Sequence, residues 1–326
     1  MLVISSTVCA LELVGCTHKP ILKSAETTIT LTKQDDNEVS NSLGKVIDAV
    51  LYSYMKSQLA LANPKSTPGA QIVVLKDGEV VFKKSYGVIQ AFDFSKDPVE
   101  KIKNILNVTD DILFDLASVT KISATTQVFM HLVYEGKVKL EDKVVQYLPD
   151  FGKNGKEEVT IGQLLSHTSG LPQWKAIYLY SNNRADTLKY IENQSLEFKS
   201  GEYKYSDLGF MTLAFVTERI TGESFDKYVT KTVYEPLGMK STMFNPLNNG
   251  IDKSKIAVTS NGNSFETMMI DEVNFPNFGY DMTADKDAFE RFSDWRNYEL
   301  QGEINDGNAF WQIKAMLDML DYFHSR

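Results

Sequence analysis

The sequence predicts an α/β protein, and three observations lead to this fold class. Residues 42–61 have the apolar spacing of an amphipathic helix, residues 70–88 have a hairpin pattern, and residues 122–245 have a mostly helical pattern. At 326 residues the chain can bury a large core, as one domain with a sizeable insertion or as two domains. We therefore expect a helix and a hairpin at the start of the domain, followed by a helical subdomain.

The first helix is predicted from apolar side chains that recur every three or four residues. These side chains are Leu43, Val46, Ile47, Val50, Leu51, Tyr54 and Leu59. Prolines and a glycine between residues 64 and 69 end the helix. The hairpin strands, residues 70–75 and 79–88, flank Asp77-Gly78, a pair that favours a two-residue hairpin turn.

The helical segment 122–245 is divided by turn residues. These are Gly136, Pro149, Gly170, Gly201, Gly222 and Gly238. Residues 245–277 are rich in Asn, Gly, Ser and Thr and predict a long surface excursion. Residues 17–41 are rich in Thr, Ser and charged residues, which predicts a flexible tether ahead of the domain at 42–326.

Composition excludes several kinds of protein. The net charge of -9 argues against nucleic-acid binding, which needs clustered Lys and Arg. Its four histidines, His18, His131, His167 and His324, lack metal-ligand spacing, so we expect no metal and no other cofactor. No segment reaches the apolar length of a transmembrane helix. We expect a monomer.

The N-terminus resembles a bacterial lipoprotein leader. Residues 13–16, Leu-Val-Gly-Cys, fit a lipobox that would place a lipid on Cys16, and residues 2–11 suit a short hydrophobic region. However, Glu12 interrupts the apolar stretch and no Lys or Arg precedes it; the alternative is an apolar N-terminal strand or helix. The leader interpretation predicts a signal peptide over residues 1–16, membrane contact only through the lipid, and a periplasmic or outer-surface location in the cell envelope.

Ser118 and Lys121 are the most informative pair in the chain. On a helix, residues three apart share one face, so the hydroxyl and the amine would lie within hydrogen-bonding reach. A desolvated lysine beside a serine can take its proton and make it a nucleophile. Taken alone, the pattern equally fits an N-cap serine with a solvated lysine.

A second motif lies downstream. Residues 205–207, Tyr-Ser-Asp, follow a Ser-Gly turn at residues 200–201 and precede an apolar helical run at residues 208–220. Without the upstream pair, Tyr205 would be taken for a buried aromatic residue with a satisfied hydroxyl.

Four phrases occur in a characteristic order: L-A-S-V-T-K at 116–121, L-L-S-H-T-S-G-L-P at 164–172, Y-S-D at 205–207 and P-L-G-M at 236–239. Together they resemble the serine β-lactamase and penicillin-binding-protein superfamily, most closely the class C β-lactamase-like serine hydrolases. The resemblance covers about residues 43–310. It implies the β-lactamase/transpeptidase-like fold, an antiparallel sheet flanked by helices with a mainly helical subdomain.

The resemblance implies a role for each site residue. Ser118 would accept the acyl group, Lys121 would lower its proton affinity, and Tyr205 would carry protons between nucleophile, leaving group and water. Trp174 either lines the cleft or is a plain core or surface aromatic residue. The segment at residues 167–170, His-Thr-Ser-Gly, is expected to shape the rim of the cleft and cap a helix rather than to act catalytically.

Asp207 departs from the family, which usually has Asn at this position. An ionised aspartate only accepts hydrogen bonds, whereas an amide also donates. Asp207 could hold the Lys121 ammonium as a substrate-site residue, but it cannot donate to the carbonyl of a substrate amide. We therefore expect esters to be accepted more easily than amide-bearing β-lactams.

The third family motif, K-T-G or H-x-G, is absent, and with it a strand that supplies an oxyanion N–H. Residues 302–309 are similar to a phrase that a subset of the family follows with G-H-A-G-L-F-S. One codon string for residues 315–325, read two bases later, gives N-A-G-H-A-G-L-F-S. This predicts a frame change near residues 311–314 and missing C-terminal strands; the alternative is a native amphipathic helix.

The predicted function is a serine hydrolase that forms an acyl-enzyme on an ester, a D-amino-acid peptide or a β-lactam. Its partners would be a small molecule or a cell-wall peptide, and a chain without its last strands would have little activity. The alternative is a non-catalytic protein that binds peptidoglycan.

Overall fold

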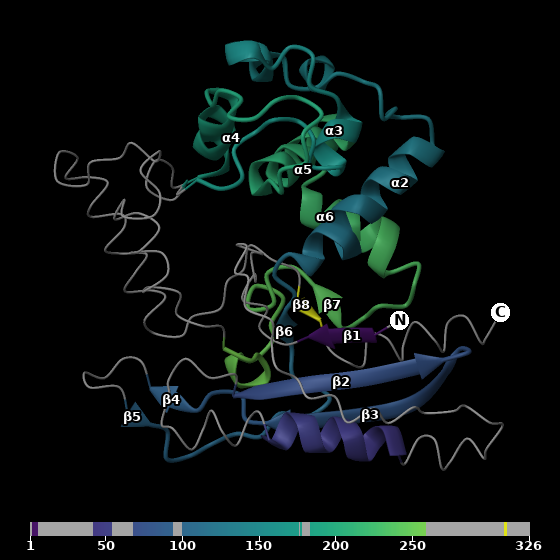
Figure 1. Ribbon diagram of the computed structural model, residues 1–326, viewed down its shortest axis with the longest axis vertical. Helices are drawn as coiled ribbons and strands as arrows, with labels where there is room; N and C mark the ends of the chain where they lie inside the picture. The colour runs from purple at the N-terminus through teal and green to yellow at the C-terminus, as the bar shows by residue number, and fades with distance from the viewer. Residues whose placement is uncertain are drawn as a thin grey trace, which may run out of the picture.

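The computed structural model describes residues 2–5, 42–53, 68–93, 100–175, 177, 183–258 and 310–311. Within them, a small sheet lies at one end of the molecule, a helical region lies at the other, and three short strands lie between the two (Figure 1). The predicted tether, Cys16, residues 302–309 and the tail after residue 311 lie outside the described residues.

The sheet is built around the predicted hairpin. Strands β2 (Gly69–Lys76) and β3 (Glu79–Gly87) pair antiparallel. The turn residues Asp77 and Gly78 have φ values of 53° and 86°. A turn with positive φ at both central residues has the twist that two antiparallel strands need, so the hairpin prediction is confirmed.

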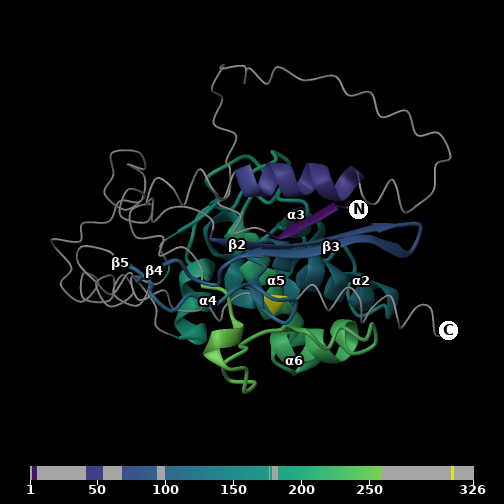
Figure 2. The same cartoon turned by 90° about the horizontal axis from the view of Figure 1, so that it is seen from below.

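A helix over residues 42–53 packs on this hairpin (Figure 2). Ile47 and Leu51 of the helix contact the small core formed by Ile72 and Tyr86. Polar contacts add to the packing, because Asp48 accepts hydrogen bonds from both Lys84 and Tyr86. The predicted first helix is confirmed as far as residue 53; its expected end at residue 61 lies outside the described residues.

Strand β1 (Leu2–Ser5) pairs antiparallel with the side of β2 that β3 leaves free, which gives a sheet in the order β1-β2-β3. The structure therefore has, at residues 2–5, the N-terminal strand that was the alternative to a leader peptide. Cleavage and lipid attachment stay predictions.

The helical region contains short elements joined by turns. They are η1 (Lys121–Thr126), α2 (Gln127–Tyr134), η2 (Val144–Gln146), η3 (Pro149–Gly155), α3 (Ile161–Leu165), α4 (Arg184–Glu192), α5 (Asp207–Thr221), α6 (Phe225–Val229) and η5 (Thr230–Tyr234). Glycines at the predicted turns 136, 170, 201, 222 and 238 all have positive φ, as those turns require. The largest core lies here, with Leu164, Leu213 and Val216 at 0% exposure. The mostly helical prediction for residues 122–245 is confirmed for the described residues.

Short strands join the two regions. β6 (Phe114–Asp115) and β7 (Thr242–Met243) both pair with β8 (Phe310–Trp311), and β4 (Phe92–Asp93) pairs with β5 (Glu100–Lys101). After β7 the chain continues through turns and η6 (Lys253–Lys255), but it does not stay on the surface as expected. Ile256 and Ala257 are buried, and Ala257 N donates to Leu113 O at 2.8 Å, so the described start of this segment packs beside β6.

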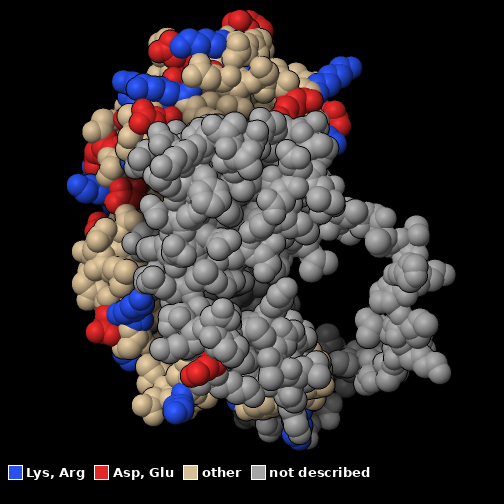
Figure 3. Space-filling model, turned by 90° about the vertical axis from the view of Figure 1, so that its left-hand side faces the viewer, with Lys and Arg blue, Asp and Glu red and all other residues tan. Residues whose placement is uncertain are grey.

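The described surface carries both charge signs. Lys and Arg alternate with Asp and Glu over the coloured part of the face in Figure 3. Among the described helices, none is long and apolar enough to cross a membrane.

Candidate active site

Ser118 lies at a sharp turn between β6 and the helix that follows it. The residue before it, Ala117, has a φ of 43°, and its N–H donates to Asp115 Oδ1 at 2.7 Å. The helix then begins, with Lys121 N donating to Ser118 O at 3.0 Å. A non-glycine residue in the left-handed region is strained, and such strain concentrates at functional sites. The turn fixes the direction in which the Ser118 side chain leaves the backbone.

Lys121 starts a π-helical segment, η1, inside the helix that runs on into α2. Within it, the Thr126 hydroxyl donates to Lys121 O at 2.8 Å. A π-helical turn is wider than an α-helical one and frequently occurs at functional sites. The sequence carries no local signal of this widening.

The Lys121 ammonium lies among the side chains of Ser118, Asp207 and Tyr205. Its Nζ lies 3.1 Å from Ser118 Oγ and 2.6 Å from Asp207 Oδ1. The contact expected from the three-residue spacing of Ser118 and Lys121 is present. Asp207, the first residue of α5, lies where the helix dipole favours negative charge. The side chains of Lys121 and Asp207 are 15% and 31% exposed, so the ion pair is only partly screened by water.

Lys121 is held in its charged form. Burial alone would lower the pKa of the Lys121 ammonium, but the charge of Asp207 and hydrogen bonds to Asp207 and Tyr205 outweigh burial and raise that pKa above its usual range. In this state Lys121 places a positive charge beside the Ser118 hydroxyl. A charged ammonium has no lone pair with which to accept a proton.

Tyr205 completes the cluster. Lys121 Nζ lies 4.9 Å from the centre of the Tyr205 ring and 5.8 Å from that of Phe210. These are cation–π distances, so both rings stabilise the ammonium charge. The Tyr205 ring is 37% exposed and is therefore reachable from outside.

The second motif is fixed to the loop that precedes it by hydrogen bonds. Ser206 is the N-cap of α5: its hydroxyl accepts from Gly209 N at 3.1 Å and donates to Pro172 O at 2.6 Å. Asp207 N donates to Gln173 O at 2.8 Å. Trp174, half-buried, follows Gln173 directly, which places it next to the Asp207 backbone contact. Whether it binds substrate stays a prediction.

His167 has a larger part in this cluster than its sequence context indicated. Its Nδ1 accepts a hydrogen bond from Ser206 N at 3.0 Å, and its ring centre lies 4.4 Å from that of Tyr205. The expected turn is present at the C-terminal end of α3, where Ser166 is the C-cap. The Ser-Thr-Gly-rich phrase predicted the turn. The contact between His167 and Ser206 spans 39 residues, and the spacing of neighbouring residues cannot predict it.

Gly170 keeps that loop close to the following segment. With φ at 83°, a Cβ added at Gly170 would lie 2.5 Å from Phe198 O, and Gly170 O accepts from the N–H groups of Glu197 and Phe198. Only glycine fits here, because any side chain would collide with backbone.

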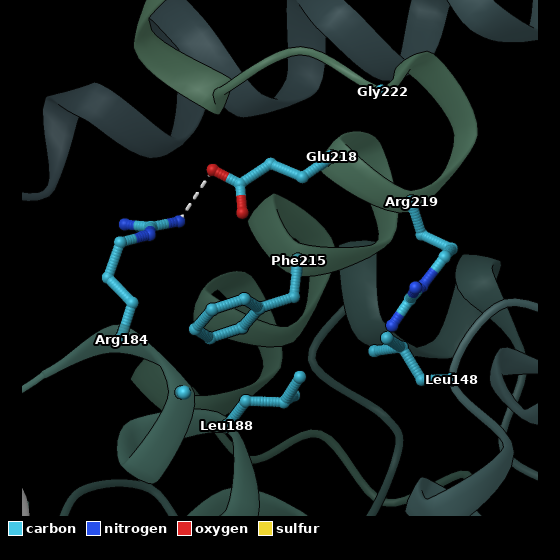
Figure 4. Close-up of a pocket in the computed structure, with 8 residues that line it drawn as sticks. Leu148, Arg184, Leu188, Phe215, Glu218, Arg219 and Gly222 are labelled. Carbon is cyan, nitrogen blue, oxygen red and sulfur yellow. Dashed lines mark hydrogen bonds and ion pairs between the residues drawn. The ribbon is translucent and has the colours of Figure 1, made fainter.

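A separate pocket of about 420 Å³ lies at the other end of α5 (Figure 4). Arg184 donates to Glu218 at 2.7 Å across its mouth, and Phe215 lies beneath the guanidinium. Glu218 also accepts from Phe225 N, so this α5 carboxylate joins α4 to the start of α6. The pocket shares no lining residue with the Ser118 cluster.

A strained turn before a serine, a lysine held beside that serine, and a tyrosine at the head of the next long helix are features of the serine β-lactamase and penicillin-binding-protein superfamily. The chain belongs to the Beta-lactamase family, whose sequence profile matches residues 55–276. The predicted β-lactamase/transpeptidase-like fold is thereby confirmed; the absence of C-terminal strands stays a prediction.

Known proteins of three kinds are similar to it. A protein named "Putative D-alanyl-D-alanine carboxypeptidase" from Escherichia coli (strain K12) is 32% identical over 261 residues, which cover 76% of this chain and 54% of the relative. An "N-acetylmuramyl-L-alanine amidase" from Bacillus subtilis (strain 168) is 32% identical over 263 residues, with the same coverage. A class C β-lactamase crystal structure superimposes with a TM-score of 0.54 at 20% identity, over 71% of this chain and 58% of that one. The chain spans about half the length of the curated relatives it matches.

Proposed function

We propose that this protein is a serine hydrolase that forms an acyl-enzyme on Ser118. The observation that carries the proposal is the 3.1 Å contact between Ser118 Oγ and a lysine whose charge is fixed by Asp207. A positive charge beside a hydroxyl favours the alkoxide that forms as the proton leaves. The named relatives, a carboxypeptidase and an amidase, act on acyl groups, which agrees with this chemistry.

The proposed reaction has two halves. Ser118 Oγ attacks the substrate carbonyl carbon and forms an ester, while its proton passes to the Tyr205 oxygen and on to the leaving group. Water then attacks the ester carbon and gives its proton to Tyr205. The bond between the acyl carbon and Ser118 Oγ breaks, Tyr205 passes the proton to Ser118 Oγ, and the acid product leaves. Lys121 stays protonated throughout and stabilises the negative charge that passes between the two oxygens.

The substrate is proposed to be an ester, a D-amino-acid peptide or a β-lactam. Asp207 favours the ester among these, because an ionised carboxylate paired with Lys121 offers a substrate amide no donor. The relatives' names favour a cell-wall peptide, and with it a place in the bacterial cell envelope.

A second candidate function is binding of cell-wall fragments without turnover. Asp207 favours this second function, because its carboxylate, 2.6 Å from Lys121 Nζ, pairs with the ammonium that would otherwise interact with the substrate. Hydrolysis of p-nitrophenyl esters would rule this candidate out, and peptide binding without hydrolysis would support it.

Labelling of the chain with a fluorophosphonate probe tests the first proposal, because the probe reacts only with an activated serine. We expect labelling at Ser118 and its loss in Ser118→Ala. Ser123→Ala is the matched control, since Ser123 lies on the same helix but donates to Val119 O. Equal labelling of Ser118→Ala and the unaltered chain would assign the nucleophile elsewhere.

A further inference from the structure

The loop after α3 supplies a residue to the Ser118 cluster that the reaction scheme does not use. Building on the proposed hydrolase function, we propose that His167 is a positioning residue whose neutral ring holds Tyr205 against Lys121. Its hydrogen bond to Ser206 N, at 3.0 Å, and its ring contact with Tyr205, at 4.4 Å, carry the inference.

The hydrogen bond fixes which ring nitrogen carries the proton. A backbone N–H can only donate, so His167 Nδ1 must have a free lone pair, and the proton of the neutral ring lies on Nε2. Ser206 is both the neighbour of Tyr205 and the N-cap of α5. The bond therefore acts directly on the backbone that carries the phenol.

Ring contacts add a second restraint. The His167 ring is tilted by 30° to the Tyr205 ring and by 33° to that of Phe210, whose centre is 4.9 Å away. Tyr203 meets His167 edge-on at 6.0 Å. Offset contacts of this kind stabilise ring pairs beyond simple burial. The same Tyr205 and Phe210 rings face the Lys121 ammonium, so His167 supports the surface on which Lys121 lies.

The backbone at His167 is itself held in place. Its φ is 57°, its carbonyl accepts from Lys204 N at 2.8 Å, and Gly201 N donates to Thr168 O at 2.8 Å. These bonds join the loop to the segment that leads into Tyr205. The imidazole is thus placed from two sides, through its ring and through its own backbone.

The charges that face His167 favour its neutral form. Burial, and then the Lys121 ammonium, lower the pKa of His167 below its usual value, while Asp207 opposes them. The phenols of Tyr203 and Tyr205 are the other titratable groups in ring contact with it. When acid does protonate His167, the new proton goes to Nδ1 and faces the Ser206 N–H. Two donors then meet, and the bond is lost.

Rates of Ser118 labelling by the fluorophosphonate as a function of pH test the inference. In the unaltered chain we expect an acid limb that follows protonation of His167. His167→Asn keeps a residue tolerated at positive φ, and His167→Phe keeps an aromatic ring but no acceptor. Each should label about tenfold more slowly, the loss expected for one hydrogen bond or one ring contact, and neither should keep the acid limb.

His131→Asn is the matched control, because His131 lies on α2 and pairs with Glu135. Its labelling rate and pH profile should equal those of the unaltered chain. His167 variants that keep both the rate and the acid limb would overturn the inference. If Ser118→Ala labels as well as the unaltered chain, the hydrolase proposal fails separately.

NMR gives a readout that needs no activity. We expect the ¹⁵N shifts of His167 to report the Nε2–H form, and the ring resonances of Tyr205 to move with the same midpoint as His167. In His167→Asn the Tyr205 movement should disappear. A Nδ1–H form of His167, or Tyr205 ring resonances that stay fixed while His167 titrates, would overturn the positioning role even in an inactive chain.

Discussion

At the scale of the residue, Asp207 balances the positive charge that Lys121 places beside Ser118. Its carboxylate lies 2.6 Å from the Lys121 ammonium and raises the pKa of that group. The pair is thereby nearly neutral as a unit. An asparagine in the same place would leave the ammonium charge unbalanced beside Ser118 and Tyr205.

Asp207→Asn should therefore make Ser118 reactive at lower pH. Removing the carboxylate takes away the main cause that raises the pKa of Lys121, and it leaves more positive charge to favour loss of the serine proton. We expect the alkaline rise of Ser118 labelling to move down by about one pH unit or more. Measured labelling rates across a pH series check this.

The control for Asp207→Asn is Asp226→Asn. Asp226 also lies in the first turn of a helix, α6, but belongs to none of the contacts around Ser118. Its profile should stay unchanged. A profile of Asp207→Asn that stays in place or moves upward would show that Asp207 does not set the charge at the site.

At the scale of the elements, the buried ammonium of Lys156 joins the ends of η3 and α4. Lys156, at 0% exposure, donates from Nζ to the backbone carbonyls of Lys153 and Glu192 at 2.9 Å each, and also to Gln194 O. Phe151 lies under the ammonium at 5.3 Å. One side chain thus satisfies carbonyls at the ends of two elements that are far apart in the chain.

Lys156→Met should lower the free energy of unfolding by about 1–3 kcal/mol, because it leaves buried carbonyls without donors. Burial lowers the pKa of Lys156 to about 8 from an ordinary 10.5. Between these values the unfolded chain binds more protons than the folded one, so this lysine's contribution to stability grows as pH rises. Denaturant unfolding of both proteins at several pH values measures the difference.

Lys153→Met is the matched control for Lys156→Met. Its side chain is 53% exposed and pairs with Asp150 on the surface, so its loss should change stability by less than about 0.5 kcal/mol. A Lys156→Met protein as stable as this control would remove the role given to the buried ammonium. A stability difference between Lys156→Met and the unaltered chain that shrinks as pH rises would contradict the direction of the pKa shift.

The elements show what the sequence could predict and what it could not. Contacts within a few residues were predictable: the Ser118–Lys121 pair follows from helical spacing, and the hairpin follows from its Asp-Gly turn. The helix over residues 42–53 was predictable from its apolar stripe. The π-helical turn at Lys121, the role of His167 and the burial of Lys156 depend on partners distant in sequence, and no local pattern records such partners.

At the scale of the whole molecule, the described residues form one large core and several smaller ones. The large core fills the helical region, while Ile72 and Tyr86 form a separate small core with the helix over residues 42–53. A small core stabilises its elements less, so we expect this helix to open more readily than the helices around α5. Asp48, through Lys84 and Tyr86, is its main polar attachment.

Asp48→Asn should speed amide exchange in residues 42–53 and leave that of α5 unchanged. Hydrogen bonds from Lys84, then Tyr86, lower the pKa of Asp48. Its contribution is therefore present above the ordinary aspartate pKa and is lost as pH falls through the lowered value. Hydrogen-exchange mass spectrometry measures this, with Glu79→Gln on the same hairpin as control. Equal protection of residues 42–53 in both variants would contradict the attachment.

Strand β1 gives the molecule a protective cover that processing could take away. Leu2 to Ser5 satisfy the outer N–H and C=O groups of β2, in a register that pairs Leu2 with Val74. A chain cut after its first residues would leave that row of groups open, and an open row accepts any extended strand of matching length. Leader removal would then do more than release the protein: it would move the open edge of the sheet from the four-residue β1 to the eight-residue β2, on which identical molecules, or an extended peptide, could assemble. Molecules with and without the leader would therefore differ in their tendency to aggregate.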